Sequence, residues 1–122
     1  MRYVSTRGRS APLAFKDVVM AGLADDGGLF LPERLPDVRG QLAAWRGLSF
    51  VDLAGRVMDQ FIDDIDAGVL RELLKRSYAD FDAVEVTPLR KLDGVSVLEL
   101  FHGPTLAFKD VALQFLGNVF SY

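Results

Sequence analysis

The residues with the clearest chemical potential lie between Leu98 and Asp110, where a single lysine follows a glycine–proline loop. An apolar run ends at Gly103 and Pro104, and we expect Lys109 to fall in the first turn of the helix that follows. The positive end of a helix dipole and partial burial would both favour the neutral amine, the form that makes Schiff bases. Taken alone, the pattern favours a simpler interpretation, a lysine whose stem covers apolar surface.

Three polar residues near this lysine are further candidates for a site. His102 is the one histidine of the sequence, and there is no cysteine. Sites that need two histidines are therefore excluded, and so are cysteine metal sites and thiol chemistry. Thr105 is equally well explained as a helix cap, and Asp110 as a favourable charge in the first helical turn. His102 could simply hydrogen-bond within its own loop. We expect no metal site.

The elements that must position this segment begin near residue 84. Residues 84–92 have an extended pattern broken by Pro88, and Asp93-Gly94 is a strong hairpin-turn signal. Residues 95–101 form a dense apolar run typical of a strand buried on both faces. We expect Thr105 to cap the last helix. Its apolar stripe comprises Phe108, Val111, Ala112, Phe115, Leu116 and Val119.

The first 45 residues predict short elements. Residues 2–7 have a strand pattern, and residues 15–23 have the apolar spacing of an amphipathic helix. Glycines in the segment 25–28 should end that helix, because glycine readily adopts a positive φ. Residues 29–32 favour a short buried extended piece. Residues 38–45 predict a weak helix, since Gly40 lies inside it.

Two capped helices follow. Ser49, with Asp52 three residues later, predicts the start of a helix that reaches Phe61. Asp66 predicts the start of a second helix that reaches Tyr78. The expected core of this half comprises Phe15, Val18, Leu29, Leu53, Val57, Phe61, Leu70, Leu73 and Leu74.

Composition sets further limits on function. A net charge of −3 argues against a nucleic-acid partner, which selects for clustered basic side chains. No stretch is long and apolar enough to span a membrane, and no signal peptide is visible, so we expect a cytoplasmic protein. Four aspartates lie within residues 59–66, and we expect a solvated acidic surface there, because the spacing of a calcium loop is missing.

Two sets of residues resemble the threonine synthase family. The sequence FHGPTLAFKD at residues 101–110 is similar to that family's pyridoxal-phosphate lysine motif, which is specific among fold-type II pyridoxal enzymes. Residues 3–8, 15–18 and 22–32 resemble the family's amino-terminal domain in the correct order. The resemblance covers essentially all 122 residues, yet only about the first quarter of a typical member.

The resemblance implies a definite fold and reaction. It implies an α/β protein with two parts. Residues 1–82 would form a mostly helical threonine-synthase-like domain that contains a short strand. Residues 83–122 would form the incomplete start of a fold-type II pyridoxal-phosphate domain. Family members convert O-phospho-L-homoserine and water to L-threonine and phosphate. By analogy, Lys109 would hold pyridoxal 5'-phosphate covalently and then move protons at the substrate carbons. The motif positions His102, Thr105 and Asp110 would shape the site.

The resemblance also marks what these residues lack. A glycine-rich loop that cradles the cofactor phosphate does not occur between Met1 and Tyr122, so we expect the chain alone to be inactive and to bind the cofactor weakly or not at all. Two alternatives stay open, a non-catalytic interaction module and a related phospho-lyase of the same lineage. An intact Lys109 favours an enzyme. The sequence does not predict the oligomeric state.

Overall fold

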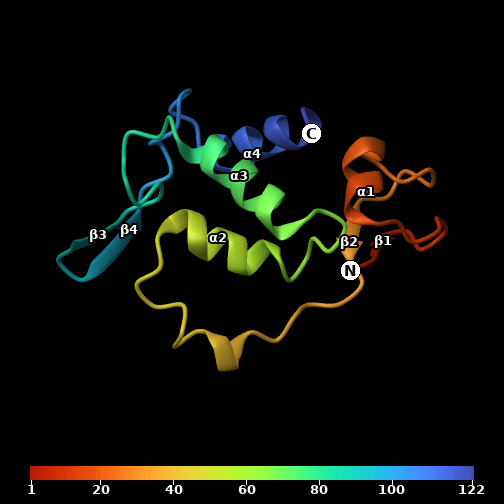
Figure 1. The fold of residues 1–122 in the computed structure, drawn as a ribbon, viewed down its shortest axis with the longest axis horizontal. Helices are drawn as coiled ribbons and strands as arrows, with labels where there is room; N and C mark the ends of the chain where they lie inside the picture. Colours follow the sequence, from red (N-terminus) through yellow and green to blue (C-terminus); the bar gives the residue numbers. More distant parts are fainter.

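Helices α2, α3 and α4 form the centre of the molecule, a mixed α/β module with two small antiparallel sheets (Figure 1). The computed structural model describes residues 1–122. The elements in chain order are β1 (Tyr3–Ser5), α1 (Phe15–Ala21), β2 (Phe30–Pro32), the 3₁₀ helix η1 (Arg39–Gln41), α2 (Phe50–Met58), α3 (Ala67–Tyr78), β3 (Leu89–Leu92), β4 (Val95–Leu98) and α4 (Asp110–Phe120). No helix combines the length and the apolar character needed to cross a bilayer.

Helix α3 lies at the centre of the core because it contributes an apolar face to both neighbouring helices. Leu70, Leu73 and Leu74 are buried as predicted, and they join a cluster that includes Phe115 and Val119 of α4. Burying each such side chain contributes about 1.5–3 kcal/mol. The core therefore draws on both the first 82 residues and the segment that carries Lys109, and α3 fixes where α4 lies (Figure 1).

Side-chain caps start α2 and α3 where the sequence predicts them. The Ser49 hydroxyl accepts the N–H of Asp52 at 3.1 Å. The Asp66 carboxylate accepts the N–H groups of Gly68 at 2.9 Å and Val69 at 3.2 Å. These bonds satisfy donors that a helix start otherwise leaves unpaired. The two caps confirm both predicted helices, although α2 ends at Met58 rather than Phe61, and Leu53 and Val57 of its apolar stripe are exposed.

A carboxylate joins the first strand to the loop before the second. Asp26 accepts the hydroxyl of Ser5 at 2.7 Å and the backbone N–H groups of Arg9 and Gly28, each at 2.9 Å. The Ser5 hydroxyl, above all, holds the pKa of Asp26 below its usual range. Strands β1 and β2 pair antiparallel beside this loop, with Val4 opposite Leu31. Asp26 thus fixes the N-terminal sheet.

Gly28 offers a test of that packing. An added Cβ would lie 2.1 Å from the Ser5 hydroxyl oxygen and 3.1 Å from the backbone nitrogen of Arg7. We expect Gly28→Ala to lower the free energy of unfolding by about 1–3 kcal/mol, the usual cost of overpacking, in urea titrations. Gly40→Ala is the matched control, because open space surrounds Gly40 and the change should be within about 0.5 kcal/mol. Equal midpoints for the two variants would contradict this account.

Several expectations for the first half were wrong in detail. Helix α1 ends at Ala21, because Gly22 adopts a φ of 70° and closes the helix before the 25–28 segment is reached. The weak helix expected over residues 38–45 is only the three-residue η1, followed by turns in the long loop beneath α2 (Figure 1). Among the expected core residues, three are exposed: Leu29, Leu53 and Val57.

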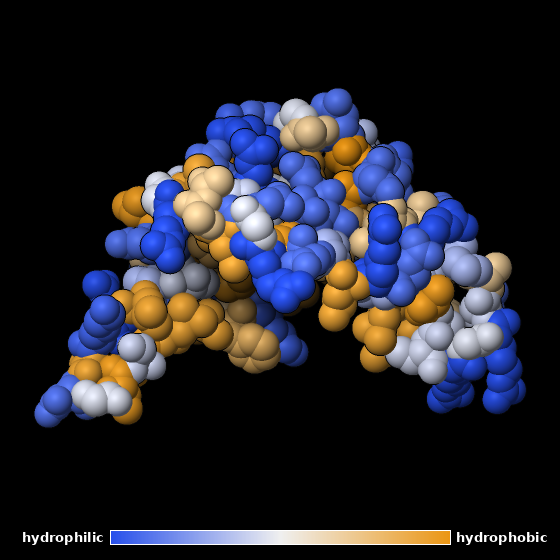
Figure 2. Space-filling view, turned by 90° about the horizontal axis from the view of Figure 1, so that it is seen from below, coloured by the Kyte–Doolittle hydropathy of each residue, from blue (hydrophilic) through white to orange (hydrophobic).

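The expectation of a strand buried on both faces over residues 95–101 was also wrong. Strands β3 and β4 pair only with each other, antiparallel, with Leu92 opposite Val95 across the predicted Asp93-Gly94 turn. All residues of both strands are exposed. The hairpin projects at the left end of the molecule, where apolar side chains lie among polar ones on the surface (Figure 2). The expected extended segment is also shorter, since it begins at Leu89 rather than Val84.

The acidic segment 59–66 has structural roles for three of its aspartates. Asp63 pairs with the amino terminus, Asp64 accepts the backbone N–H of Lys16 at 2.9 Å, and Asp66 caps α3. These carboxylates are therefore spread over separate contacts along the connection between α2 and α3. Asp63 and Asp66 are exposed as expected, but Asp64 is half-buried and its Oδ1 is buried without a partner, so the expected solvated surface does not include it.

Candidate functional site

The candidate site is built around the loop of residues 103–109, which leads from the hairpin into α4. Thr105 does not cap the helix, as the sequence predicted; α4 begins five residues later, at Asp110. The physical reason is a competing contact. The Asp110 carboxylate accepts the Thr105 backbone N–H at 2.7 Å and the Thr105 hydroxyl at 2.8 Å. These bonds fold residues 104–109 into turns instead of helix.

The loop is tightly wound against Asp110. A Cβ added to Gly103 would lie 2.4 Å from the Cβ of Asp110, so only glycine fits at this close approach. Leu106 adopts a φ of 61°, a left-handed conformation that is unfavourable for a residue with a Cβ, and its N–H donates to the Gly103 carbonyl at 3.0 Å. A strained backbone of this kind persists only where its surroundings hold it.

Lys109 occupies the N-cap position of α4 rather than its first turn. The expectation of partial burial was wrong: Lys109 is exposed, and the neighbouring Phe108 side chain is 66% exposed. No ion pair or side-chain hydrogen bond involves Lys109, and the adjacent Asp110 carboxylate bonds to Thr105. The lysine amine is therefore unpaired and open to solvent.

Electrostatics keep Asp110 ionised inside the fold. The residue is only 2% exposed. Burial raises the pKa of its carboxyl, but the hydrogen bonds from the Thr105 hydroxyl and backbone N–H outweigh burial, and the pKa lies below its ordinary value. Asp110 is therefore a fixed acceptor at the base of the loop at neutral pH.

His102 belongs to a separate network that includes neither Thr105 nor Asp110. Its Nδ1 lies 2.5 Å from an Asp82 carboxylate oxygen, and its Nε2 lies 2.8 Å from a Glu99 oxygen. The Phe101 ring stacks on the imidazole, and Arg90 of β3 lies 3.4 Å from the same Glu99 oxygen. This network ties the segment after α3 to the hairpin and to the start of the loop.

The network predicts a pH-dependent stability. The hydrogen bonds with Glu99, and then with Asp82, raise the pKa of His102 above its ordinary value of 6.5. Since the folded chain binds this proton more tightly than the unfolded chain, the contribution is fully present below pH 6.5 and is lost as the pH rises through the raised pKa. Urea midpoints of the wild type should therefore fall over this range relative to those of His102→Gln. Midpoints that stay parallel at every pH would refute the prediction.

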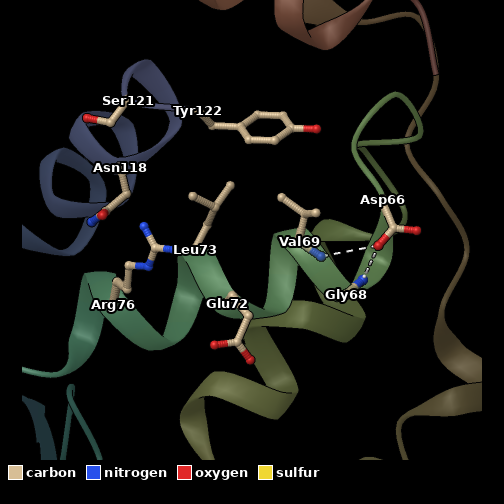
Figure 3. Close-up of a pocket in the computed structure, with 9 residues that line it drawn as sticks. All are labelled: Asp66, Gly68, Val69, Glu72, Leu73, Arg76, Asn118, Ser121 and Tyr122. Carbon is tan, nitrogen blue, oxygen red and sulfur yellow. Dashed lines mark hydrogen bonds between the residues drawn. The ribbon is translucent and has the colours of Figure 1, made fainter.

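A pocket lies away from these residues. It has a volume of about 590 Å³ and lies between one face of α3 and the C-terminal end of α4 (Figure 3). Figure 3 shows Arg76 and Asn118 at one side of it and Asp66, bonded to Gly68 and Val69, at the other. None of the four candidate site residues lines it. The cavity is therefore not the site that the sequence motif predicts.

The structure brings together only some of the residues that the sequence singled out. Thr105 and Asp110 bond directly to each other, and Lys109 immediately precedes Asp110 in the chain. His102 lies in a separate network, bonded to Asp82 and Glu99. The sequence reasoning missed both of these carboxylates. Glu99 precedes His102 by three residues, a spacing that could have suggested the contact, but Asp82 is brought in only by the fold.

Comparison with known proteins gives a consistent result. The sequence profile described as "Threonine synthase N terminus" matches residues 2–78. The threonine synthase of Schizosaccharomyces pombe is 51% identical over 98% of this chain, which covers 24% of that protein. The threonine synthase of Pseudomonas aeruginosa is 50% identical over 100% of this chain, which covers 27% of that protein. A crystal structure of PLP-bound threonine synthase from Brucella melitensis superposes with a TM-score of 0.95 at 46% identity, covering 100% of this chain and 27% of that one. The chain thus spans about a quarter of the length of these relatives. It belongs to the threonine synthase family and corresponds to the family's N-terminal region.

Proposed function

We propose that this chain forms the N-terminal part of a threonine synthase, which converts O-phospho-L-homoserine and water to L-threonine and phosphate. The observation that carries the proposal is the free Lys109 amine at the start of α4, within a chain that superposes with a TM-score of 0.95 on a PLP-bound threonine synthase. The exposed, unpaired lysine lies in the motif that resembles the family's cofactor lysine. A non-catalytic module would not require an unpaired lysine at this position.

The residues present fit the part of a pyridoxal-phosphate site that supplies the lysine amine. Lys109 is exposed and free of partners, so it would hold the cofactor aldehyde. When bound, the cofactor supplies an electron sink for charge that develops at the substrate carbons. Lys109 would hold and move the protons at those carbons, while the Thr105–Asp110 contact orients its helix start. His102, held by two carboxylates, would shape the loop entrance. The phosphate group needs backbone N–H groups that a glycine-rich loop elsewhere in the enzyme would supply.

We also propose a boundary near residue 82 between an N-terminal domain and the start of the cofactor domain. The family profile ends at residue 78, which supports this boundary. Residues 83–122 would then be the start of a fold-type II pyridoxal-phosphate domain. The bond from the Asp82 N–H to the His102 carbonyl, at 3.0 Å, links the two parts.

The test is a product assay on the full-length protein. With O-phospho-L-homoserine and pyridoxal phosphate we expect phosphate and L-threonine to form in equal amounts. Phosphate release without threonine would favour the related phospho-lyase instead, and no release at all would favour the interaction module. The 122-residue chain alone should show no turnover, since it lacks the phosphate-cradling loop.

A further inference from the structure

We propose that Asp110 is a positioning residue, which fixes the start of α4 and so the place from which Lys109 reaches the cofactor. This inference rests on the proposed function, because it assigns a role within that reaction. Asp110 would act through Lys109 and would touch neither substrate nor cofactor.

The first argument is that Asp110 uses both carboxylate oxygens inside its own loop. One oxygen accepts the Thr105 backbone N–H at 2.7 Å, and the other accepts the Thr105 hydroxyl at 2.8 Å. The residue is 2% exposed, so neither contact is loosened by solvent. The bonds close a ring from residue 105 to residue 110. The carboxylate is buried and bonds to Thr105, and it forms no ion pair with Lys109.

The second argument is that the ring holds a backbone that would otherwise relax. Leu106 has a φ of 61°, and Gly103 packs so closely on Asp110 that a Cβ would approach to 2.4 Å. Such conformations persist where contacts over-determine them, and they concentrate at functional sites. Asp110 supplies contacts on both sides of Leu106, since Gly103 packs on it and its own N–H donates to the Ala107 carbonyl at 3.0 Å.

The consequence for catalysis follows from the chain itself. Lys109 and Asp110 share one rigid peptide unit, so a backbone shift at Asp110 after its contacts are lost also moves the Cα of Lys109. A displacement of about 1 Å at a reacting group can slow a reaction by about 10²-fold. Substrate binding groups outside this loop would keep their places. Loss of the Asp110 contacts should therefore lower kcat far more than it changes KM.

The experiment uses the full-length protein and the variant Asp110→Asn. Asparagine keeps the size of the side chain but removes its charge, and its amide NH₂ faces either the Thr105 N–H, which can only donate, or the hydroxyl, which must then turn to accept. We expect kcat to fall about 10²-fold with KM for O-phospho-L-homoserine changed less than about threefold, and borohydride to trap pyridoxal phosphate on Lys109 more slowly. Thr105→Val should give a smaller loss, and the double variant should be no slower than Asp110→Asn alone, because the hydroxyl acts only through Asp110.

The matched control is Asp26→Asn, since Asp26 also accepts one hydroxyl and backbone N–H groups but lies in the N-terminal sheet. It should lower stability and leave kcat and the trapping rate unchanged. Unchanged kcat in Asp110→Asn, or equal losses in both variants, would overturn the positioning role. If Asp110→Asn does not fold, an unchanged kcat in Thr105→Val overturns it instead. A wild type that is not trapped on Lys109 would refute the proposed function itself, whatever the variants do.

Discussion

Replacing Lys109 with alanine should abolish turnover of O-phospho-L-homoserine by the full-length protein. The change removes the covalent link to the cofactor and the group that moves protons, and loss of an acid–base group alone costs about 10²–10⁴-fold in rate. We expect the pyridoxal-phosphate absorbance that is retained after gel filtration to disappear as well. Steady-state phosphate release and the absorbance spectrum measure the two effects separately.

Lys91→Ala provides the matched control for that variant. Lys91 is an exposed lysine on β3, on the hairpin that precedes the candidate loop. Its replacement should leave both the rate and the retained cofactor close to the wild type. Substantial turnover by Lys109→Ala, or an equal loss in both variants, would show that the motif lysine is not the cofactor lysine.

The largest effect on stability is expected at Leu74, whose side chain is 0% exposed in the core between α2, α3 and α4. Leu74→Ala removes a buried side chain and leaves a cavity, which typically costs about 2–5 kcal/mol in the free energy of unfolding. Urea unfolding of the chain, followed by circular dichroism, should show a lower midpoint with little change in slope.

Leu35→Ala is the control, because Leu35 is 83% exposed in the loop before η1. Its free energy of unfolding should change by less than about 0.5 kcal/mol. A similar small change for Leu74→Ala would mean that α3 does not lie at the centre of the core.

The helices of the first half could be predicted because their signals are local. The caps at Ser49 and Asp66 precede apolar stripes with helical spacing, and the same residues form the caps in the structure. The start of α4 could not be predicted in this way. Thr105 has the residue type of a cap, but Asp110 captures its hydroxyl and N–H, and that choice depends on the tight packing of Gly103.

The hairpin shows the limit of an apolar pattern. Val95 and Val97 favour a strand, and the Asp93-Gly94 turn sets its partner, both correctly. Apolar residue types alone do not say what covers a strand, and here neither face is covered. The partners of His102 were missed for a related reason, since Asp82 reaches it only after the chain has folded back from α3.

Borohydride reduction of the full-length protein with pyridoxal phosphate, followed by peptide mapping, tests the central claim most directly. Lys109 is the exposed, unpaired lysine of the family motif, at the N-cap of α4. We expect a single pyridoxyl label on the peptide that contains Lys109. A label on Lys16, Lys75 or Lys91 in its place would contradict it.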